Sequence, residues 1–189
     1  MFVLGIDPGL SRCGYGVLEQ FSGSGTQRTR TEAVALGVIR TDPAEPQAAR
    51  LATQLRELQA LISEFQPSVV AVERVFFQVN ARTAIGVAQV AGLAMAVAAA
   101  EGLEVVEYTP TQVKQAVAGW GGADKDQMKR MVAELLALPG PPEPADAADA
   151  AAVALCHLSQ APWHSASTGA RARVLLPASG AAAAPPGAQ

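Results

Sequence analysis

The sequence predicts an α/β protein whose mixed sheet combines an antiparallel three-strand meander with parallel strands and is flanked by helices. Two features of the 189 residues indicate this class. Three short apolar segments near the N-terminus are separated only by turns and loops, which is typical of antiparallel strands. Further along the chain, helical patterns alternate with apolar runs of strand length, which is typical of the βαβ units that build parallel sheets.

The first strand is expected over Phe2–Ile6, because this apolar run stops at the turn Asp7-Pro8-Gly9. The second and third strands are expected over Tyr15–Leu18 and Ala33–Ile39. The segment between them, FSGSGTQRTR, is rich in glycine, serine and threonine. It therefore predicts a hairpin loop over residues 21–30, and the three strands together form the meander.

The middle of the chain changes to a helical period. Leucine or isoleucine recurs every three or four positions from 51 to 62, which predicts an amphipathic helix over residues 45–64. The apolar run Val69–Val72 ends at Glu73 and predicts a strand buried on both faces. Thr109 and Pro110 suit the N-cap and first turn of a helix. The other expected elements are a strand over 103–108 and helices over 81–100, 111–118, 124–136 and 145–158.

Length and composition indicate one folded domain over residues 1–161 and a disordered tail over 162–189, since the tail is mainly alanine, proline, glycine and serine. Cys13 and Cys156 are too few for a disulfide framework or a four-cysteine zinc site, and Cys156 and His157 are expected to be ordinary packing residues. The N-terminus lacks the features of a signal peptide and the longest apolar run is too short to span a bilayer, so we expect a cytoplasmic protein.

The net charge is −3 at pH 7 and the sequence pI is about 5.4. This balance excludes a polybasic nucleic-acid coat and a membrane-surface binder, because both need excess lysine and arginine spread over a face. Binding to nucleic acid through a few local lysines and arginines stays compatible with it.

Four carboxylates stand out by their positions. Asp7 and Glu73 end the first and fourth expected strands, and ligands gather at the carboxyl ends of parallel strands. Asp146 and Asp149 are spaced i, i+3, so they share one helix face. Converging carboxylates repel one another unless cations neutralise them, and oxygen-only ligands select Mg²⁺ or Mn²⁺. Two such ions can activate a water and stabilise the leaving oxygen in phosphodiester hydrolysis.

Each of these residues also has a plainer explanation. Asp7 would belong only to a turn, and Glu73 would be a solvated residue at a strand end. Asp146 and Asp149 would simply favour the dipole of their helix. The joint pattern of the four acids favours the catalytic interpretation.

The segments that carry the acids resemble one known family. GIDPGLSRCGYGV, VAVERVFFQVNARTA and PADAADAAAVALCH, in this order, closely resemble the RuvC family of Holliday-junction resolvases, and TPTQVKQAVAGWGGADKDQM resembles the family's segment before the last of them. The resemblance covers residues 1–160. It implies an RNase H-like fold, a homodimer, and Mg²⁺-dependent resolution of four-way DNA junctions by paired symmetric nicks in recombination and repair.

Carried over by position, the resemblance implies that Asp7, Glu73, Asp146 and Asp149 are the catalytic, metal-binding acids. Two Mg²⁺ ions per active site are expected, with Mn²⁺ able to substitute. Some family members carry histidine where this chain has Asp146. The products are expected to carry 5′-phosphate and 3′-hydroxyl ends, and the expected partners are junction DNA and a branch-migration complex of the RuvA and RuvB type.

DNA contacts are expected close to these acids. Lys114 and Lys125 match family lysines near the junction's phosphates, where lysine serves as a flexible point cation. The alternative is that they are surface lysines paired with Asp124 or Asp126. Phe76 matches a family position that stacks on an unpaired base, and core packing is the alternative there. The full expected set is Lys114, Lys125, Arg74, Phe76, Phe77, Arg82, Lys129 and Arg130.

The helix over 81–100 is apolar nearly all round from Ile85 onward, so it must be buried on more than one side. One side can cover the sheet, and the other is expected to pack on a second copy of the chain. Small residues spaced along this helix permit close approach of the backbones. The expected dimer-interface residues are Ala84, Ala88, Gly92 and Ala96. The alternative is a helix enclosed within one domain.

Other functions remain open from the sequence. A related RNA-processing nuclease shares the GIDPG start, and cleavage of structured RNA in place of junction DNA would favour it. An actin-like ATP-binding protein also begins with a GIDxG strand, but it needs a second lobe and a second phosphate loop, and nucleotide binding would reveal it. A catalytically inactive DNA-binding subunit agrees less well with the presence of all four acids.

Overall fold

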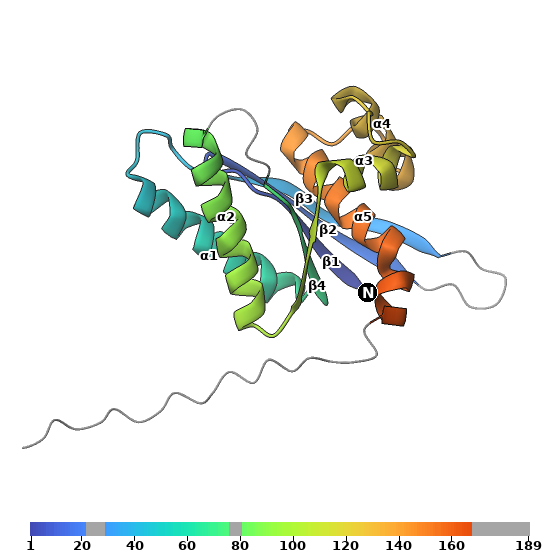
Figure 1. The fold of residues 1–189 in the computed structure, drawn as a ribbon, viewed down its shortest axis with the longest axis horizontal. Coiled ribbons are helices and arrows are strands. Elements are labelled where there is room, and N and C mark those ends of the chain that lie inside the picture. The colour runs from blue at the N-terminus through green and yellow to red at the C-terminus, as the bar shows by residue number, and fades with distance from the viewer. Residues whose placement is uncertain (22–28, 76–80, 168–189) are drawn as a thin grey trace, which may run out of the picture.

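The computed structural model describes residues 1–21, 29–75 and 81–167, with backbone only at 81–83 and 161–167. Five strands of this described part form one mixed sheet in the order β3-β2-β1-β4-β5 (Figure 1). The first three strands pair with one another in antiparallel fashion, whereas β4 pairs in parallel with β1 and β5 pairs in parallel with β4. The predicted sheet is therefore confirmed. The strands are β1 (Phe2–Asp7), β2 (Arg12–Phe21), β3 (Arg30–Arg40), β4 (Val69–Glu73) and β5 (Glu104–Tyr108).

Helices cover both faces of the sheet (Figure 1). One face carries α1 and α2, and the other carries α3, α4 and α5, with α5 lying across β1 and β2. Each face has its own apolar core, because alternate strand residues point to opposite sides. Val3 belongs to the core under α5, and Leu4 belongs to the core under α1 and α2. The helices are α1 (Gln47–Phe65), α2 (Ala81–Ala100), α3 (Pro110–Ala118), α4 (Lys125–Leu135) and α5 (Ala145–Ser167).

The last helix is longer than its sequence pattern predicts. We expected it to end at Leu158 and the tail to begin at Pro162, but α5 continues to Ser167. Proline usually interrupts a helix because it lacks an N–H donor, which is why the sequence pattern indicated an earlier end. The start of the predicted tail was therefore placed too early, and residues 168–189 lie outside the described part.

Strands β2 and β3 also extend beyond their predicted bounds. Polar residues such as Glu19 and Gln20 continue the ladder, pairing with Glu32 and Thr31 across the hairpin. The apolar pattern alone could not show this, because backbone pairing rather than side-chain burial sustains these ends. The hairpin loop itself, residues 22–28, lies outside the described part.

Three glycines let α5 approach the sheet very closely. A Cβ atom added at Gly5 would overlap the Ala150 carbonyl oxygen, and one added at Gly14 would overlap that of Asp146. Gly16 meets the backbone of α5 in the same way, at Ala151. The helix backbone therefore rests directly on β1 and β2 near Asp146 and Ala150, which positions the acids at the start of α5 relative to the sheet.

Local capping agrees with the predicted helix starts. Thr109 caps α3 in a capping box, with Pro110 in the first turn, and the Asp124 carboxylate caps α4 by accepting from the Gln127 N–H at 2.7 Å. Cys156 and His157 are buried packing residues as expected, and the His157 ring is hydrogen-bonded to the Tyr108 hydroxyl. Within the described ranges, no helix is both long and apolar enough to cross a membrane.

Candidate active site

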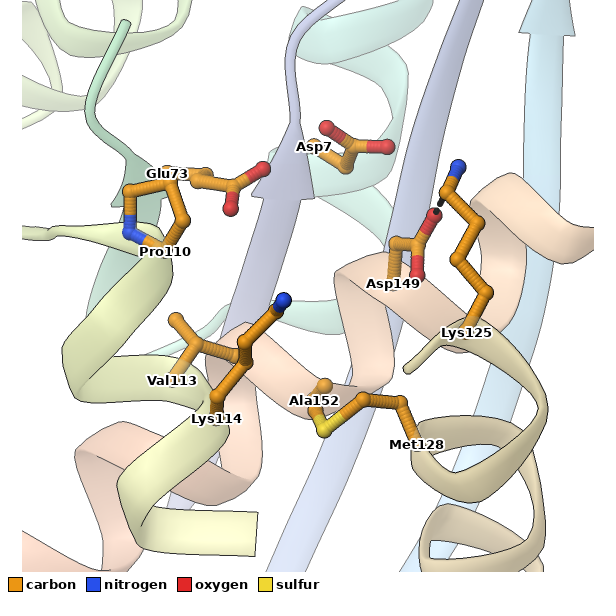
Figure 2. Close-up of a pocket in the computed structure, with 9 residues that line it drawn as sticks. All are labelled: Asp7, Glu73, Pro110, Val113, Lys114, Lys125, Met128, Asp149 and Ala152. Atoms are coloured by element: carbon orange, nitrogen blue, oxygen red, sulfur yellow. Dashed lines mark ion pairs between the residues drawn. The ribbon is translucent and has the colours of Figure 1, made fainter. Parts of the chain in front are cut away.

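Asp7 and Glu73 come together because their strands are neighbours. β1 and β4 run in parallel with Ile6 opposite Val72, so the next residue of each strand emerges at the same end of the sheet. Figure 2 shows the Glu73 side chain directed toward Asp7, and the charge of Glu73 raises the pKa of Asp7. The expected convergence of these two acids is what the structure shows.

Asp149 completes the group from the opposite side. It projects from α5 toward Asp7, and with Glu73 the three acids line one open pocket of about 300 Å³ (Figure 2). The pocket lies between the sheet and helices α3, α4 and α5. Its full lining is Asp7, Glu73, Pro110, Val113, Lys114, Lys125, Met128, Asp149 and Ala152.

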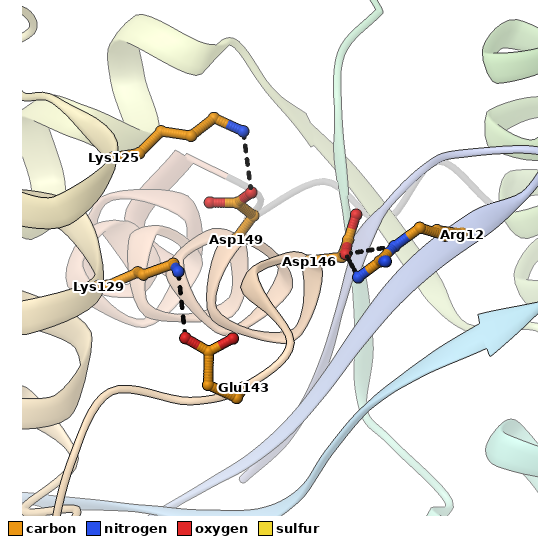
Figure 3. Close-up of polar contacts among 6 residues, drawn as sticks. All are labelled: Arg12, Lys125, Lys129, Glu143, Asp146 and Asp149. Carbon is orange, nitrogen blue, oxygen red and sulfur yellow. Dashed lines mark hydrogen bonds and ion pairs between the residues drawn. The ribbon is translucent and has the colours of Figure 1, made fainter.

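Asp146 lies one turn before Asp149 but has a different partner. Its Oδ2 accepts hydrogen bonds from Nε and Nη2 of Arg12, at 2.8 and 2.5 Å (Figure 3). Asp146 is not among the residues that line the pocket, although its charge reaches Asp7 and Asp149. The structure thus gathers three of the four predicted acids in the pocket and holds the fourth beside it on an arginine.

The pocket is electrostatically unfavourable for three ionised carboxylates. Burial raises the pKa of Asp7 well above its ordinary value, and the nearby charges of Glu73 and Asp149 raise it further. Burial also raises the pKa of Glu73 and of Asp149. The carboxyl groups therefore favour holding a proton unless positive charge is supplied to the pocket.

Two lysines extend into the same space. Lys114 reaches it from α3 and Lys125 reaches it from α4 (Figure 2), and both lower the pKa of Glu73. The Lys125 Nζ lies 3.9 Å from Asp149 Oδ2. The alternative that Lys125 pairs with Asp124 or Asp126 does not hold, since its carboxylate partner is Asp149.

A divalent cation suits this set of donors. The three acids of the pocket offer carboxylate oxygens, which are the ligands that Mg²⁺ and Mn²⁺ prefer. Burial, together with the charges of neighbouring acids, raises the pKa values of Asp7, Glu73 and Asp149, and a bound cation would offset both effects. Among the described residues no three acidic, histidine or cysteine side chains already stand at metal-binding distances.

The other predicted DNA contacts lie around the pocket or outside the described part. Arg74 follows β4 and is paired with Glu107 at 3.7 Å, and Lys129 is paired with Glu143 at 3.3 Å (Figure 3). Arg130 is exposed on α4. Phe76 and Phe77 and the side chain of Arg82 lie outside the described residues.

The predicted dimer helix presents two distinct faces. Val90, Ala94 and Val97 are buried against the rest of the chain. The four predicted interface residues are instead half-buried or exposed, and a Cβ added at Gly92 would meet no atom within 4 Å. A face of α2 is therefore open in the single chain, and its burial by a second copy stays a prediction. The four residues are Ala84, Ala88, Gly92 and Ala96.

Sequence reasoning missed Arg12 and the glycines under α5. An arginine five residues after Asp7 gave no signal of its own, because its partner Asp146 is 134 positions away. Gly14 and Gly16 alternate in GYG, which is the period of one sheet face, and this spacing could have indicated a closely packed helix.

Comparison with known proteins identifies relatives along most of the chain. Residues 3–157 match the family model "Crossover junction endodeoxyribonuclease RuvC". The protein of that name from Moorella thermoacetica is 48% identical over 163 residues, which are 86% of this chain and 94% of the relative. A solved structure of Thermus thermophilus RuvC superposes with a TM-score of 0.78 at 35% identity, covering 87% of this chain and 97% of that one. A second structure, of T. thermophilus RuvC in complex with a Holliday junction substrate, has a TM-score of 0.75 at 32% identity, covering 86% and 96%.

Proposed function

The chain belongs to the RuvC family of crossover junction endodeoxyribonucleases, and from this membership we propose that it resolves four-way DNA junctions by metal-dependent hydrolysis at the Asp7 pocket. The observation that carries the proposal is the convergence of Asp7, Glu73 and Asp149 in a pocket that raises the pKa of all three. A T. thermophilus relative has been solved with a junction substrate, which supports the same substrate here.

The acids are proposed to hold two Mg²⁺ ions, with Mn²⁺ able to substitute. Asp7, Glu73 and Asp149 would hold the ions from the pocket, and Asp146 would join them if it exchanged its contact with Arg12. When bound, the ions supply activation of water and stabilisation of the leaving oxygen. The P–O3′ bond breaks as water oxygen bonds to phosphorus, so the products are a 5′-phosphate and a 3′-hydroxyl.

Lys114 and Lys125 are proposed to bind the phosphates beside the cut. Both line the pocket, on helices α3 and α4 whose buried residues belong to the core. Their charges offset the repulsion between the acids and the DNA backbone. Paired nicks also require two such sites, so we propose a homodimer through the open face of α2, working in the cytoplasm with a branch-migration complex of the RuvA and RuvB type.

The direct test is cleavage of a synthetic four-way junction in Mg²⁺, in Mn²⁺ and in EDTA. The wild-type chain is expected to cut the junction only with metal and to leave a linear duplex and a structured RNA intact. Asp7→Asn is expected to lose cleavage by roughly 10³-fold or more while it binds the junction with similar affinity.

Asp126→Asn is the matched control. Asp126 is exposed on α4, so this substitution removes the same charge at a position outside the pocket. It should cut like the wild type. Full activity of Asp7→Asn would refute the catalytic assignment. Preferential cleavage of structured RNA would instead support the RNA-processing alternative.

A further inference from the structure

The loop that joins β1 to β2 directly follows Asp7 and lines a second pocket of about 370 Å³. Helix α1 contributes Arg50 to this pocket, and the loop contributes Arg12 and the Ser11 hydroxyl. None of these residues lines the acidic pocket. The full lining is Gly9, Leu10, Ser11, Arg12, Arg50, Gly86 and Val87.

Arg50 is held in position by hydroxyl groups. Its Nη2 donates to Ser11 Oγ at 2.5 Å and its Nε donates to Thr41 Oγ1 at 3.0 Å. In the described ranges no carboxylate lies within ion-pair distance of Arg50. A half-buried guanidinium that contacts only neutral oxygens keeps its full charge available for an anion from outside.

The backbone carbonyls of the β1–β2 loop are arranged in a way that is compatible with the binding of an anion. The carbonyls of Gly9 and Leu10 both accept from Gln54 Nε2 at 3.2 Å, and the Ser11 carbonyl accepts from the Thr41 N–H at 3.1 Å. Gln54 is fully buried, so these contacts fix the loop against α1 and β3. The acceptors that would repel an anion are therefore already engaged on the protein side.

Arg12 connects the two pockets. Its guanidinium contacts Asp146 of the acid group, and the same residue lines the second pocket with Arg50. Because the loop directly follows Asp7, we expect a phosphodiester strand with one phosphate at Asp7 to pass close to these two arginines. Two planar guanidinium groups and a hydroxyl match the several oxygens of a phosphate.

We propose that Arg12, Arg50 and the Ser11 hydroxyl form a second phosphate-binding site, which holds a backbone phosphate of the DNA strand adjacent to the phosphate cut at the Asp7 pocket. The inference rests on the proposed function, since it takes junction DNA as the ligand. It adds a site on the β1–β2 loop and α1 to the lysine contacts on α3 and α4.

The first experiment measures junction binding in EDTA over a range of salt concentrations. Arg50→Ala is expected to weaken binding at 50 mM salt roughly tenfold and to make the slope of log K against log salt shallower by about 0.9, the value for one lost phosphate contact. Arg56→Ala is the matched control, because Arg56 lies exposed on the same helix and contacts only Thr53. It should leave affinity and slope unchanged.

The Arg50→Lys variant distinguishes the effect of the positive charge from the effect of the hydrogen bonds that Arg50 makes to the loop. A lysine keeps the positive charge but loses the paired contacts to Ser11 and Thr41, so the salt slope should stay near the wild-type value. A single uncharged methylphosphonate, moved along the strand around the cut, should weaken binding of the wild type at one neighbouring position and weaken binding of Arg50→Ala less at that position.

An unchanged salt slope for Arg50→Ala, or an equal loss for Arg50→Ala and Arg50→Lys, would overturn the second site. Cleavage of the junction by the wild type in Mg²⁺, measured on the same preparation, tests the proposed function separately. If the wild type cuts and Arg50→Ala binds normally, only the second site fails.

Discussion

At the scale of single residues, the acidic pocket disfavours the ionised form of the carboxyl groups that line it. Burial raises the pKa of Asp7, Glu73 and Asp149, and Asp7 is raised further by the two neighbouring acids. At a pH between the ordinary and the raised pKa values, the native state therefore binds more protons than the unfolded chain does. Stability without metal therefore falls as the pH rises above the ordinary carboxyl range near 4 and through the raised pKa values.

Asp7→Asn should remove part of this dependence. In EDTA at pH 7.5 the variant is expected to be more stable than the wild type by about 1 kcal/mol, or roughly 2–4 °C in Tm, because one unfavourable charge is gone. Near pH 4 the two proteins should melt alike, since Asp7 is then protonated. Calorimetric melts across this pH range measure the difference, and a variant that melts lower at pH 7.5 would contradict it.

The sequence predicted these acids unevenly. Asp7 and Glu73 follow apolar strands, and the parallel pairing of those strands is a sufficient reason for them to meet. The helical spacing of Asp146 and Asp149 predicted a shared face, yet one contacts an arginine and the other lines the pocket. That difference depends on Arg12, a residue far away in the chain, and no local pattern reports such a contact.

At the scale of elements, the close packing of α5 on β1 and β2 sets the geometry of the site. Order and type of the elements could be predicted, because strand and helix periods are local properties. The end of α5 could not, because the helix continues past a proline that normally marks a helix end. The close packing of α5 on three glycines could likewise not be predicted from the apolar pattern.

Gly14→Ala should therefore disturb the site as well as the fold. The added methyl group would overlap the Asp146 carbonyl oxygen, and backbone cannot move aside as a side chain can. We expect a loss of about 3 kcal/mol or more in the free energy of unfolding, measured by urea denaturation. Gly140→Ala is the control, because a Cβ there meets no atom within 4 Å, and it should change stability by less than about 0.5 kcal/mol. Equal stability of both variants would contradict the packing argument.

The open face of α2 gives a second prediction at this scale. Ala88→Glu should place a charge in the proposed dimer interface while it preserves helix propensity, so the variant should sediment as a monomer and lose paired nicking. Ala60→Glu makes the same change at an exposed position of α1 and should stay dimeric. Sedimentation equilibrium distinguishes the two, and a dimeric Ala88→Glu would argue against this interface.

At the scale of the whole molecule, the chain is an RNase H-like nuclease that carries a net charge of −3 and yet is proposed to act on DNA. The positions of the basic residues in the structure explain how both statements can hold. Lysines 114 and 125 line the acidic pocket, while Arg12 and Arg50 line the pocket beside it. Local charge, and not the total, is what a phosphate meets within a Debye length.

Metal should stabilise the whole fold, because cations bind the native acid cluster and not the unfolded chain. At a Mg²⁺ concentration 100 times the dissociation constant, stability should rise by about 2.7 kcal/mol, which corresponds to roughly 5–10 °C in Tm. NaCl of equal ionic strength is the control and should have little effect. The same melting temperature in both salts would show that the pocket does not bind the cation.

The order of the acids along the chain has a consequence for biosynthesis. Residues 7 and 73 emerge from the ribosome early, but Asp146 and Asp149 follow only after every strand of the described sheet has been made. A nascent or prematurely terminated chain thus lacks half of the acid set, even where its first strands have begun to fold. If the four acids act together as proposed, we expect cutting activity only from chains that extend past Asp149.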